Sequence, residues 1–236
     1  PTTGFYTRVT QAALDEALAA HPEAAAVVVT SPTYEGYISR LHCSVPLVVD
    51  AAHGAHLGLA PWLPGRMEGD AVICSYHKTL PALTQTAGVQ VYDSSLAPKI
   101  KRYMDMYETS SPSYVLMNSV AKMADLVSDP AAFETLQAGL QKLYKLPLEH
   151  LRLIQADDPT KINISTLHCN IDGNALAHRL RARGIEPEMS DRIHVICMAT
   201  AGDTAAGFHL LARTLTEIDR TLSPGDWPVA PLSLPP

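Results

Sequence analysis

Three short runs of mostly apolar, β-branched residues limit most strongly what this chain can fold into. Runs of this kind are typical of strands buried on both faces of a parallel sheet. They are AAAVVVTSP at 24–32, VPLVVDAAH at 45–53 and GDAVICSYHK at 69–78. Because the segments between them leave room for crossover connections, we predict an α/β fold, a mainly parallel sheet with flanking helices.

The rest of the chain predicts helices and then a second, smaller set of strands. Helical spacing over 8–20, with Thr10 as a cap, precedes the first run. Pro112 and Pro130 divide the helical segment 94–145 into three. Beyond it a βαβ-like stretch predicts a small α+β lobe. Its expected elements are a strand over 161–169, a helix over 172–184 that ends at Gly184, a strand over 192–200 and a helix over 203–222 with Asp203 as its N-cap.

These patterns predict four parts of the chain. They are part of a large domain at 1–128, a helical connector at 129–148, a small α+β lobe at 149–222 and a proline-rich linker or tail at 223–236. The sequence begins without Met and closes on a proline-rich end that is typical of a linker. We therefore expect a fragment of a longer polypeptide.

Composition excludes some classes of partner. A formal charge of −6 and the absence of a dense Lys/Arg stretch argue against a nucleic-acid or anionic-membrane binder. Apolar residues make up 47% of the chain, but none of the runs is long enough to span a bilayer. The four cysteines are scattered without a C-x-x-C pair, so we expect a reduced, cytoplasmic protein.

Each of the three runs ends in polar or titratable residues, at the place where open parallel sheets bind ligands. Asp50 ends one run and Lys78 another, so a carboxylate and an amine are expected a ligand's width apart. A carboxylate keeps a neighbouring ring nitrogen protonated, and a lysine partly withdrawn from water becomes a usable nucleophile. Pyridoxal phosphate requires both groups.

Each of these residues also has an ordinary structural interpretation. A lysine after a strand is usually a solvated end residue, and an aspartate there usually caps a turn or a helix. His53 and His56 form an H-x-x-H pair that could bind a metal, but no third ligand accompanies them at a recognisable spacing. No metal site is predicted, and spacing alone leaves the cofactor site and the structural interpretation both open.

Six motifs in chain order carry a resemblance that spacing could not supply. They are SPTYEGYIS, LVVDAAHGAHLG, SYHKTLPALTQTA, SPSYVLMNS, DPTKINIS and GIEPEMSD. Together they resemble the major domain of the ornithine/lysine/arginine decarboxylase family. These are pyridoxal-phosphate enzymes of the aspartate-aminotransferase fold, called fold type I. The resemblance covers nearly the whole chain, and implies that residues 1–128 are the second half of the cofactor-binding large domain.

The resemblance implies a role for each matching residue. Lys78 matches the family's Schiff-base lysine, and Asp50 matches the aspartate that pairs with the pyridine nitrogen. His53 falls where the family places a side chain near the ring and its phenolic oxygen. Ser75 and His77 match residues that help to hold the cofactor phosphate, and Lys78 or His77 is expected to return a proton to the substrate's α-carbon.

Departures from the family pattern are as informative as the matches. Ala51 stands where the family usually has Glu. The turn that cups the phosphate and the histidine that stacks on the ring are expected before the point where this sequence begins. In the TSPTYEG turn, Thr33 and Tyr34 are candidate pocket residues, with plain Pro/Gly turn geometry as the alternative.

The resulting hypothesis is a pyridoxal-phosphate-dependent decarboxylase, a carbon–carbon lyase, acting on lysine, ornithine or arginine. Its expected partners are a small amino-acid substrate and either a second copy of the chain, as a homodimer, or a complementing chain that carries the missing segment. The alternative is a truncated, inactive homologue that serves as a binding or structural partner. Other chemistries also run on this fold with the same lysine and aspartate.

Overall fold

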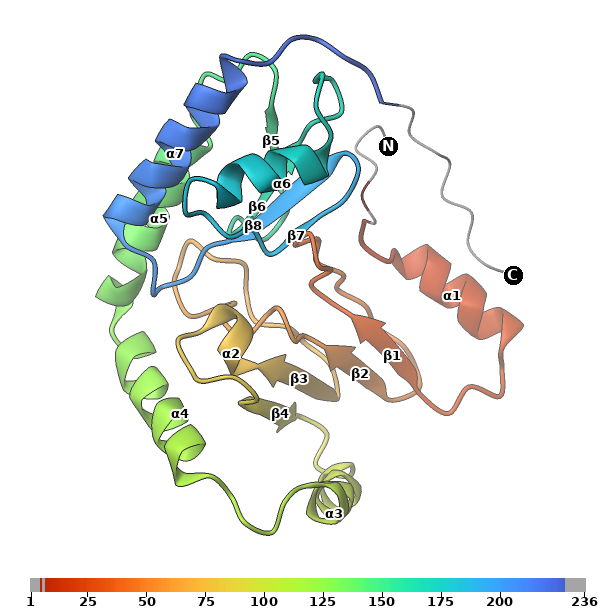
Figure 1. The fold of residues 1–236 in the computed structure, drawn as a ribbon. Helices are drawn as coiled ribbons and strands as arrows, with labels where there is room; N and C mark the ends of the chain where they lie inside the picture. Colours follow the sequence, from red (N-terminus) through yellow and green to blue (C-terminus); the bar gives the residue numbers. More distant parts are fainter. Residues whose placement is uncertain (1–4, 6, 228–236) are drawn as a thin grey trace.

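Two four-stranded sheets form the two lobes of the molecule (Figure 1). The computed structural model describes residue 5 and residues 7–227. The first sheet has the order β1-β2-β3-β4, with parallel β1–β2 and β2–β3 pairs and an antiparallel β3–β4 pair. Its strands are β1 (Val27–Thr30), β2 (Leu47–Asp50), β3 (Ala71–Ser75) and β4 (Ala87–Val91). The α/β fold with a mainly parallel sheet is therefore confirmed, and β4 is a strand that the sequence pattern did not predict.

One face of the first sheet makes a core, and the other face is open. Val29, Val49 and Val72 lie side by side in register and point into that core. Leu14 of α1 (Gln11–Ala20) packs there, and Thr10 caps this helix as predicted, accepting a hydrogen bond from the Ala13 N–H. On the opposite face, the side chain of Val28 is 73% exposed.

The third predicted strand is wrong at its end. The extended backbone stops at Ser75, and α2 (Tyr76–Thr79) follows directly as one helical turn. Lys78 therefore lies on a helix at the carboxyl end of the strand. Two longer helices follow, α3 (Ala97–Tyr107) and α4 (Tyr114–Val127).

The second lobe is antiparallel throughout, so the predicted βαβ-like arrangement is wrong. Its sheet has the order β5-β6-β8-β7, and β6 pairs directly with β8. The strands are β5 (Arg152–Ile154), β6 (Lys161–Ser165), β7 (Met189–Ser190) and β8 (His194–Met198). The alternation read over 161–169 did not predict that all five residues of β6 are buried. Both faces of β6 are covered, one by the second core and the other by the first lobe.

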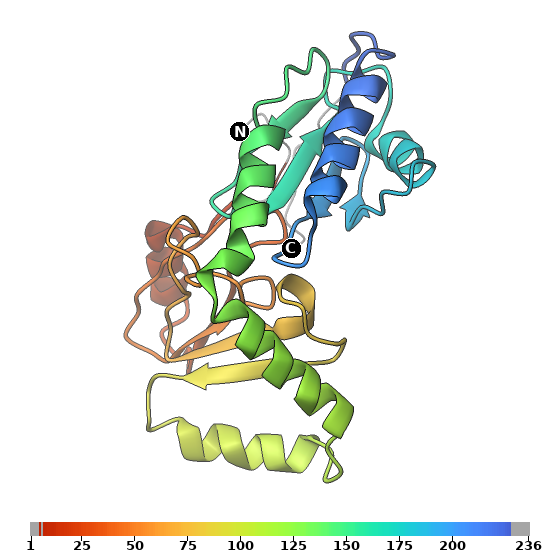
Figure 2. The same cartoon turned by 90° about the vertical axis from the view of Figure 1, so that its left-hand side faces the viewer.

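Helices pack around this sheet and link the two lobes. They are the 3₁₀-helix η1 (Pro130–Phe133), α5 (Glu134–Leu143), α6 (Gly173–Arg181) and α7 (Ala205–Asp219). Figure 2 shows α4 and α5 running in succession along one side, from the first lobe to the second. The predicted cap of the last helix is wrong by one residue, because Thr204 caps α7 and Asp203 accepts a hydrogen bond from the Thr200 N–H.

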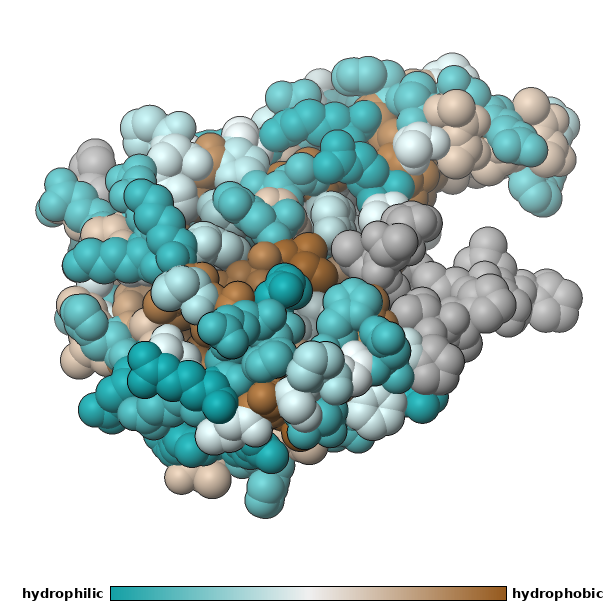
Figure 3. Space-filling model, turned by 90° about the horizontal axis from the view of Figure 1, so that it is seen from above, coloured by the Kyte–Doolittle hydropathy of each residue, from teal (hydrophilic) through white to brown (hydrophobic). Residues whose placement is uncertain are grey.

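The end of the described chain stays attached to the second lobe. The Trp227 indole N–H donates to the carbonyl oxygens of Cys169 (2.9 Å) and Ile171 (3.1 Å). The rest of the predicted linker, 228–236, lies outside the described residues. Within the part of the chain that the structure describes, no helix is both long and apolar enough to cross a bilayer. Seen from above, the surface is mainly hydrophilic, with hydrophobic side chains showing between the hydrophilic ones near the middle (Figure 3).

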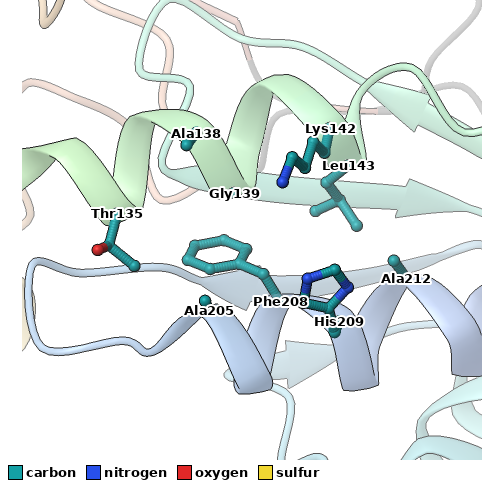
Figure 4. Close-up of a pocket in the computed structure, with 9 residues that line it drawn as sticks. All are labelled: Thr135, Ala138, Gly139, Lys142, Leu143, Ala205, Phe208, His209 and Ala212. Carbon is teal, nitrogen blue, oxygen red and sulfur yellow. The ribbon is translucent and has the colours of Figure 1, made fainter.

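Close contact between α5 and α7 closes the second core. Figure 4 shows the Phe208 ring lying between the two helices under Gly139. A Cβ atom at Gly139 would lie 2.3 Å from Cδ2 and 2.4 Å from Cγ of Phe208. Phe208 and Leu140 both belong to the buried core, and the ring would have to shift to make room for a Cβ atom at position 139. The absence of a side chain at position 139 sets the spacing of the two helices.

We predict that Gly139→Ala destabilises the protein although alanine is the better helix former. Helix propensity alone favours alanine by about 1 kcal/mol, whereas overpacking costs about 1–3 kcal/mol. Denaturant unfolding of wild type and variant measures the difference. In a Phe208→Leu background the same substitution is expected to lose its penalty, and an equal penalty in both backgrounds would contradict this explanation.

Candidate functional site

The carboxyl ends of β2 and β3 bring predicted site residues to one face of the first sheet. Asp50 is paired in register with Ile73, and Ser75 lies two residues further along β3. Side chains two residues apart on a strand share a face, so Asp50 and Ser75 point to the same side. This is the open side, where Ile73 is 41% exposed. A ligand can therefore approach both side chains.

Asp50 keeps one carboxylate oxygen available. Its Oδ1 accepts a hydrogen bond from the Ala52 N–H at 3.1 Å. Among the described residues, Oδ2 has neither a hydrogen-bond nor an ion-pair partner. The negative charge of Asp50 also acts on Cys74: burial, and to a smaller extent Asp50, raise the pKa of the Cys74 thiol.

Lys78 is a half-buried residue on α2, and none of the described carboxylates forms an ion pair with it. Its Nζ makes no hydrogen bond or ion pair within the described residues. Next to it, the hydroxyl oxygen of Thr79 is buried without a hydrogen-bond partner. Ser75 stands at the N-cap of α2 but does not cap it with its side chain. Several polar groups on this turn therefore make no hydrogen bond to another described residue and are available to a ligand.

One ring nitrogen of His77 is hydrogen-bonded to the backbone of a neighbouring turn. Its Nδ1 lies 2.9 Å from the carbonyl oxygen of Thr86. Since a carbonyl oxygen only accepts, Nδ1 carries a proton, and Nε2 is the ring atom left for other contacts. The bond ties α2 to the turn before β4.

His53 lies at the centre of the polar cluster. It is 7% exposed, its Nδ1 lies 3.0 Å from Nζ of Lys161, and its ring tilts against the Tyr34 ring at 4.7 Å between centroids. Burial lowers the pKa of His53 to about 3, with further lowering by the positive charges of Lys161 and Lys78. His53 is therefore a neutral imidazole at physiological pH, close enough to both amines to feel them.

Lys161, which was not predicted from the sequence, is fully buried in this cluster, at 0% exposure. It lies on β6 of the second lobe. Burial lowers the pKa of Lys161 to about 8; Asp158 and Glu188 act to raise it and Lys78 acts to lower it. A lysine opening the otherwise uncharged run KINIS was the available signal, since a lysine is rarely fully buried without a partner.

His56 pairs with Asp158 in the same buried region. Its Nε2 lies 3.1 Å from Asp158, and the Thr160 hydroxyl donates to Asp158 at 2.7 Å. Burial alone would raise the pKa of Asp158, but His56, Lys161 and the Thr160 hydroxyl outweigh it and lower that pKa. Within the described chain no three His, Cys, Asp or Glu side chains are grouped so as to hold a metal ion.

Of the two candidates in the TSPTYEG turn, Tyr34 reaches the cluster. Its hydroxyl donates to Glu188 of the second lobe at 2.6 Å, and burial and this hydrogen bond raise the pKa of Tyr34 to about 12. The Thr33 hydroxyl instead accepts a hydrogen bond from the Tyr37 N–H within the turn. Thr33 therefore serves the turn, and Tyr34 lines the cluster beside His53.

The available groups fit the chemical needs of pyridoxal phosphate. An unpaired amine suits covalent attachment to a carbonyl group. A carboxylate with a free oxygen suits a protonated ring nitrogen. Both stand at the carboxyl ends of strands, where α/β sheets bind ligands.

Comparison with known proteins gives this arrangement a context. The family model for the Orn/Lys/Arg decarboxylase major domain matches residues 2–147. An arginine decarboxylase of Halalkalibacterium halodurans is 30% identical over 251 residues, which cover 92% of this chain and 50% of that protein. The chain thus spans about half the length of the curated relatives that it matches.

Solved structures show the same fold at low identity. Lysine decarboxylase A from Pseudomonas aeruginosa superposes with a TM-score of 0.68 at 17% identity, covering 89% of this chain and 40% of that one. A structure of SPT with PLP superposes with a TM-score of 0.61 at 14% identity, covering 83% of this chain and 55% of that one. These likenesses show that the chain shares the fold of these proteins.

We predict that His53 makes the stability of the protein depend on pH between about 6.5 and 3. An unfolded histidine binds a proton below about pH 6.5, whereas folded His53 stays neutral down to about pH 3. The unfolded state then holds more protons, so the stabilisation present above pH 6.5 is lost as the pH falls. The slope is about 1.4 kcal/mol per pH unit.

Denaturant unfolding of wild type and His53→Gln from pH 7 to pH 4.5 measures this contribution. The glutamine keeps an acceptor for Lys161 and removes the titration. The difference in unfolding free energy between the two proteins should change steadily over this range. A difference that is independent of pH would contradict a depressed pKa for His53.

Proposed function

The chain belongs to the Orn/Lys/Arg decarboxylase family, and from this premise we propose that it decarboxylates a basic amino acid with pyridoxal phosphate attached to Lys78. Lysine, ornithine and arginine are the candidate substrates. The observation that carries the proposal is a pair of opposite charges at the carboxyl ends of neighbouring strands, neither of which is paired with another described residue. Lys78 provides the amine and Asp50 the free carboxylate oxygen, with neutral His53 close to Lys78.

Five side chains are proposed to hold the cofactor, each through a property already described. Lys78 attaches it covalently, and Asp50 holds a proton at the pyridine nitrogen. His53 contacts the ring region, and Ser75 and His77 contribute contacts to the phosphate. When bound, the cofactor supplies an electron-poor ring that accepts the electron pair left by the departing carboxylate.

The proton that replaces the carboxylate needs a donor within the site. Lys78 and His77 are the two candidates, and they are neighbours on α2. Because the Nδ1 of His77 is bound to the Thr86 carbonyl, Nε2 is its available atom for this proton transfer. A positioned donor of this kind contributes about 10²–10⁴-fold to a rate.

We also propose that a second polypeptide surface completes the site, in a homodimer or with a complementing chain. The relatives are about twice as long as this chain. Large apolar side chains are exposed on the open sheet face and on α3 and α4, among them Val28, Tyr107, Tyr114 and Val115. Exposed apolar side chains of this size are available for contact with a second polypeptide.

Chemical labelling tests the attachment site. We expect the chain, incubated with pyridoxal phosphate and reduced with borohydride, to carry the stable label at Lys78 in peptide mapping. Lys78→Ala should lose that label and the visible absorption band of lysine-linked cofactor. Lys122→Ala, which removes an exposed lysine on α4, is the matched control and should keep both.

The result separates the proposal from its alternative. Label spread over exposed lysines, in equal amount in wild type and Lys78→Ala, would contradict cofactor attachment at this site and favour an inactive binding partner. With a label at Lys78, carbon dioxide release from lysine, ornithine and arginine is then compared to identify the substrate. Lys78→Ala is expected to lower that release at least about 10²-fold, since it removes the covalent step.

A further inference from the structure

A buried hydrogen bond joins the two lobes at the candidate cofactor site. Lys161 comes from β6 of the second lobe, and His53 follows β2 of the first lobe. Their Nζ and Nδ1 atoms are 3.0 Å apart. The two side chains are separated by 108 positions in the sequence, so only the docking of the lobes brings them together.

Lys161 is held in place from several sides. Gly36, at φ +97°, packs so closely on the lysine stem that a Cβ there would lie 2.8 Å from its Cγ. Within the second lobe, the Sδ of Met198 on β8 lies 3.2 Å from the Nζ of Lys161. The surrounding loop is fixed as well, because the Asp158 N–H donates to the Gly36 carbonyl at 2.9 Å. These contacts hold the Nζ of Lys161 where it donates a hydrogen bond to His53.

This contact decides which nitrogen of His53 carries the proton. An ammonium group has donors only, so Nδ1 of His53 must accept. The neutral ring then carries its proton on Nε2. Among the described residues Nε2 has no hydrogen-bond partner, so this N–H donor is free for a ligand.

We propose that Lys161 is a positioning residue that fixes His53 as the Nε2–H tautomer and aims this donor at an acceptor oxygen of the bound ligand. Resting on the proposed function, that ligand is pyridoxal phosphate. Lys161 thereby makes the correct state of a residue in the first lobe dependent on the second lobe. If the lobes were undocked, the Lys161–His53 hydrogen bond would be lost, and the Nε2–H tautomer of His53 would no longer be fixed.

The same geometry argues against a different role for Lys161, as a second point of cofactor attachment. Its amine is fully buried and already hydrogen-bonded. Lys78, by contrast, is half-buried and has no hydrogen-bond or ion-pair partner in the part of the chain that the structure describes. The two amines near His53 thus have separate tasks.

Nitrogen-15 NMR of histidine-labelled chain tests the proposal without any cofactor. His53 is assigned by comparison with His53→Gln. In wild type at pH 7 we expect a protonated, pyrrole-type Nε2 and an unprotonated, pyridine-type Nδ1. A protonated Nδ1 in the wild-type spectrum would overturn the proposal, whatever the variants do.

Lys161→Met keeps the side-chain volume and removes the donor. We expect the two nitrogen signals of His53 to lose their fixed assignment. The titration midpoint of His53 should also move up by about one unit or more, since a nearby like charge is gone, leaving Lys78, His56 and Asp158 as the titratable groups that face it. An unchanged His53 signature in this variant would overturn the proposal.

Two further variants keep the test sharp if Lys161→Met folds poorly. Met198→Leu removes the other contact of Nζ and is the matched control, expected to leave the His53 signals as in wild type. Gly36→Ala should displace the lysine stem and change the His53 signals in the same sense as Lys161→Met. The opposite pattern in these two variants would contradict a role for the Lys161 contact.

Adding pyridoxal phosphate separates failure of the inference from failure of the proposed function. A shift of the Nε2 signal on addition supports the assigned ligand. An unmoved Nε2 signal in chain that is labelled at Lys78 would overturn it. Absence of label at Lys78 counts against the proposed function alone, because the spectra of the cofactor-free chain still decide on the Lys161 contact.

Discussion

The buried ammonium group of Lys161 needs hydrogen-bond acceptors, and this need constrains how the two lobes pack together. Lys161 has no exposed surface, and an uncompensated charge in that position would be strongly unfavourable. Its compensation comes from His53 in the first lobe and from the fields of Asp158 and Glu188 in the second. Arg8 adds a second polar link between the lobes, because its Nη2 donates to both carboxylate oxygens of Asp157 at 2.8 Å. The candidate site therefore lies where the structure depends most on paired polar groups.

Site chemistry follows from which charges remain unpaired in this setting. Lys161 is hydrogen-bonded to His53 and feels the charges of Asp158 and Glu188, whereas Lys78 and the second oxygen of Asp50 are left without partners in the described residues. This contrast distinguishes the two lysines, of which Lys161 opens β6 and Lys78 lies on α2, directly after β3. Burial, and then the charges of Lys161 and Lys78, lower the pKa of His53 and so hold its ring neutral.

The sequence was most informative where local physics decides the structure. The β-branched runs predicted β1, β2 and β3, and the strand-end rule brought Asp50 and Ser75 to one face. Long-range pairing was less accessible: the antiparallel contact of β6 with β8 and the added strand β4 depend on partners distant in the chain. Lys161 was missed for the same reason, since nothing in KINIS indicates that a loop from residue 36 will cover it. The helical turn at Lys78 was misread because its apolar flanks extend the strand pattern.

The central claim is that Lys78 and Asp50 face a common space that receives a flat, pyridine-type cofactor. A crystal structure of the chain soaked with pyridoxal phosphate tests it most directly. The account predicts continuous density from the Nζ of Lys78 to the cofactor, with the free Asp50 oxygen within hydrogen-bond distance of the ring nitrogen. Density joined to another lysine, or an Asp50 carboxylate separated from the ring by packed side chains, would contradict it.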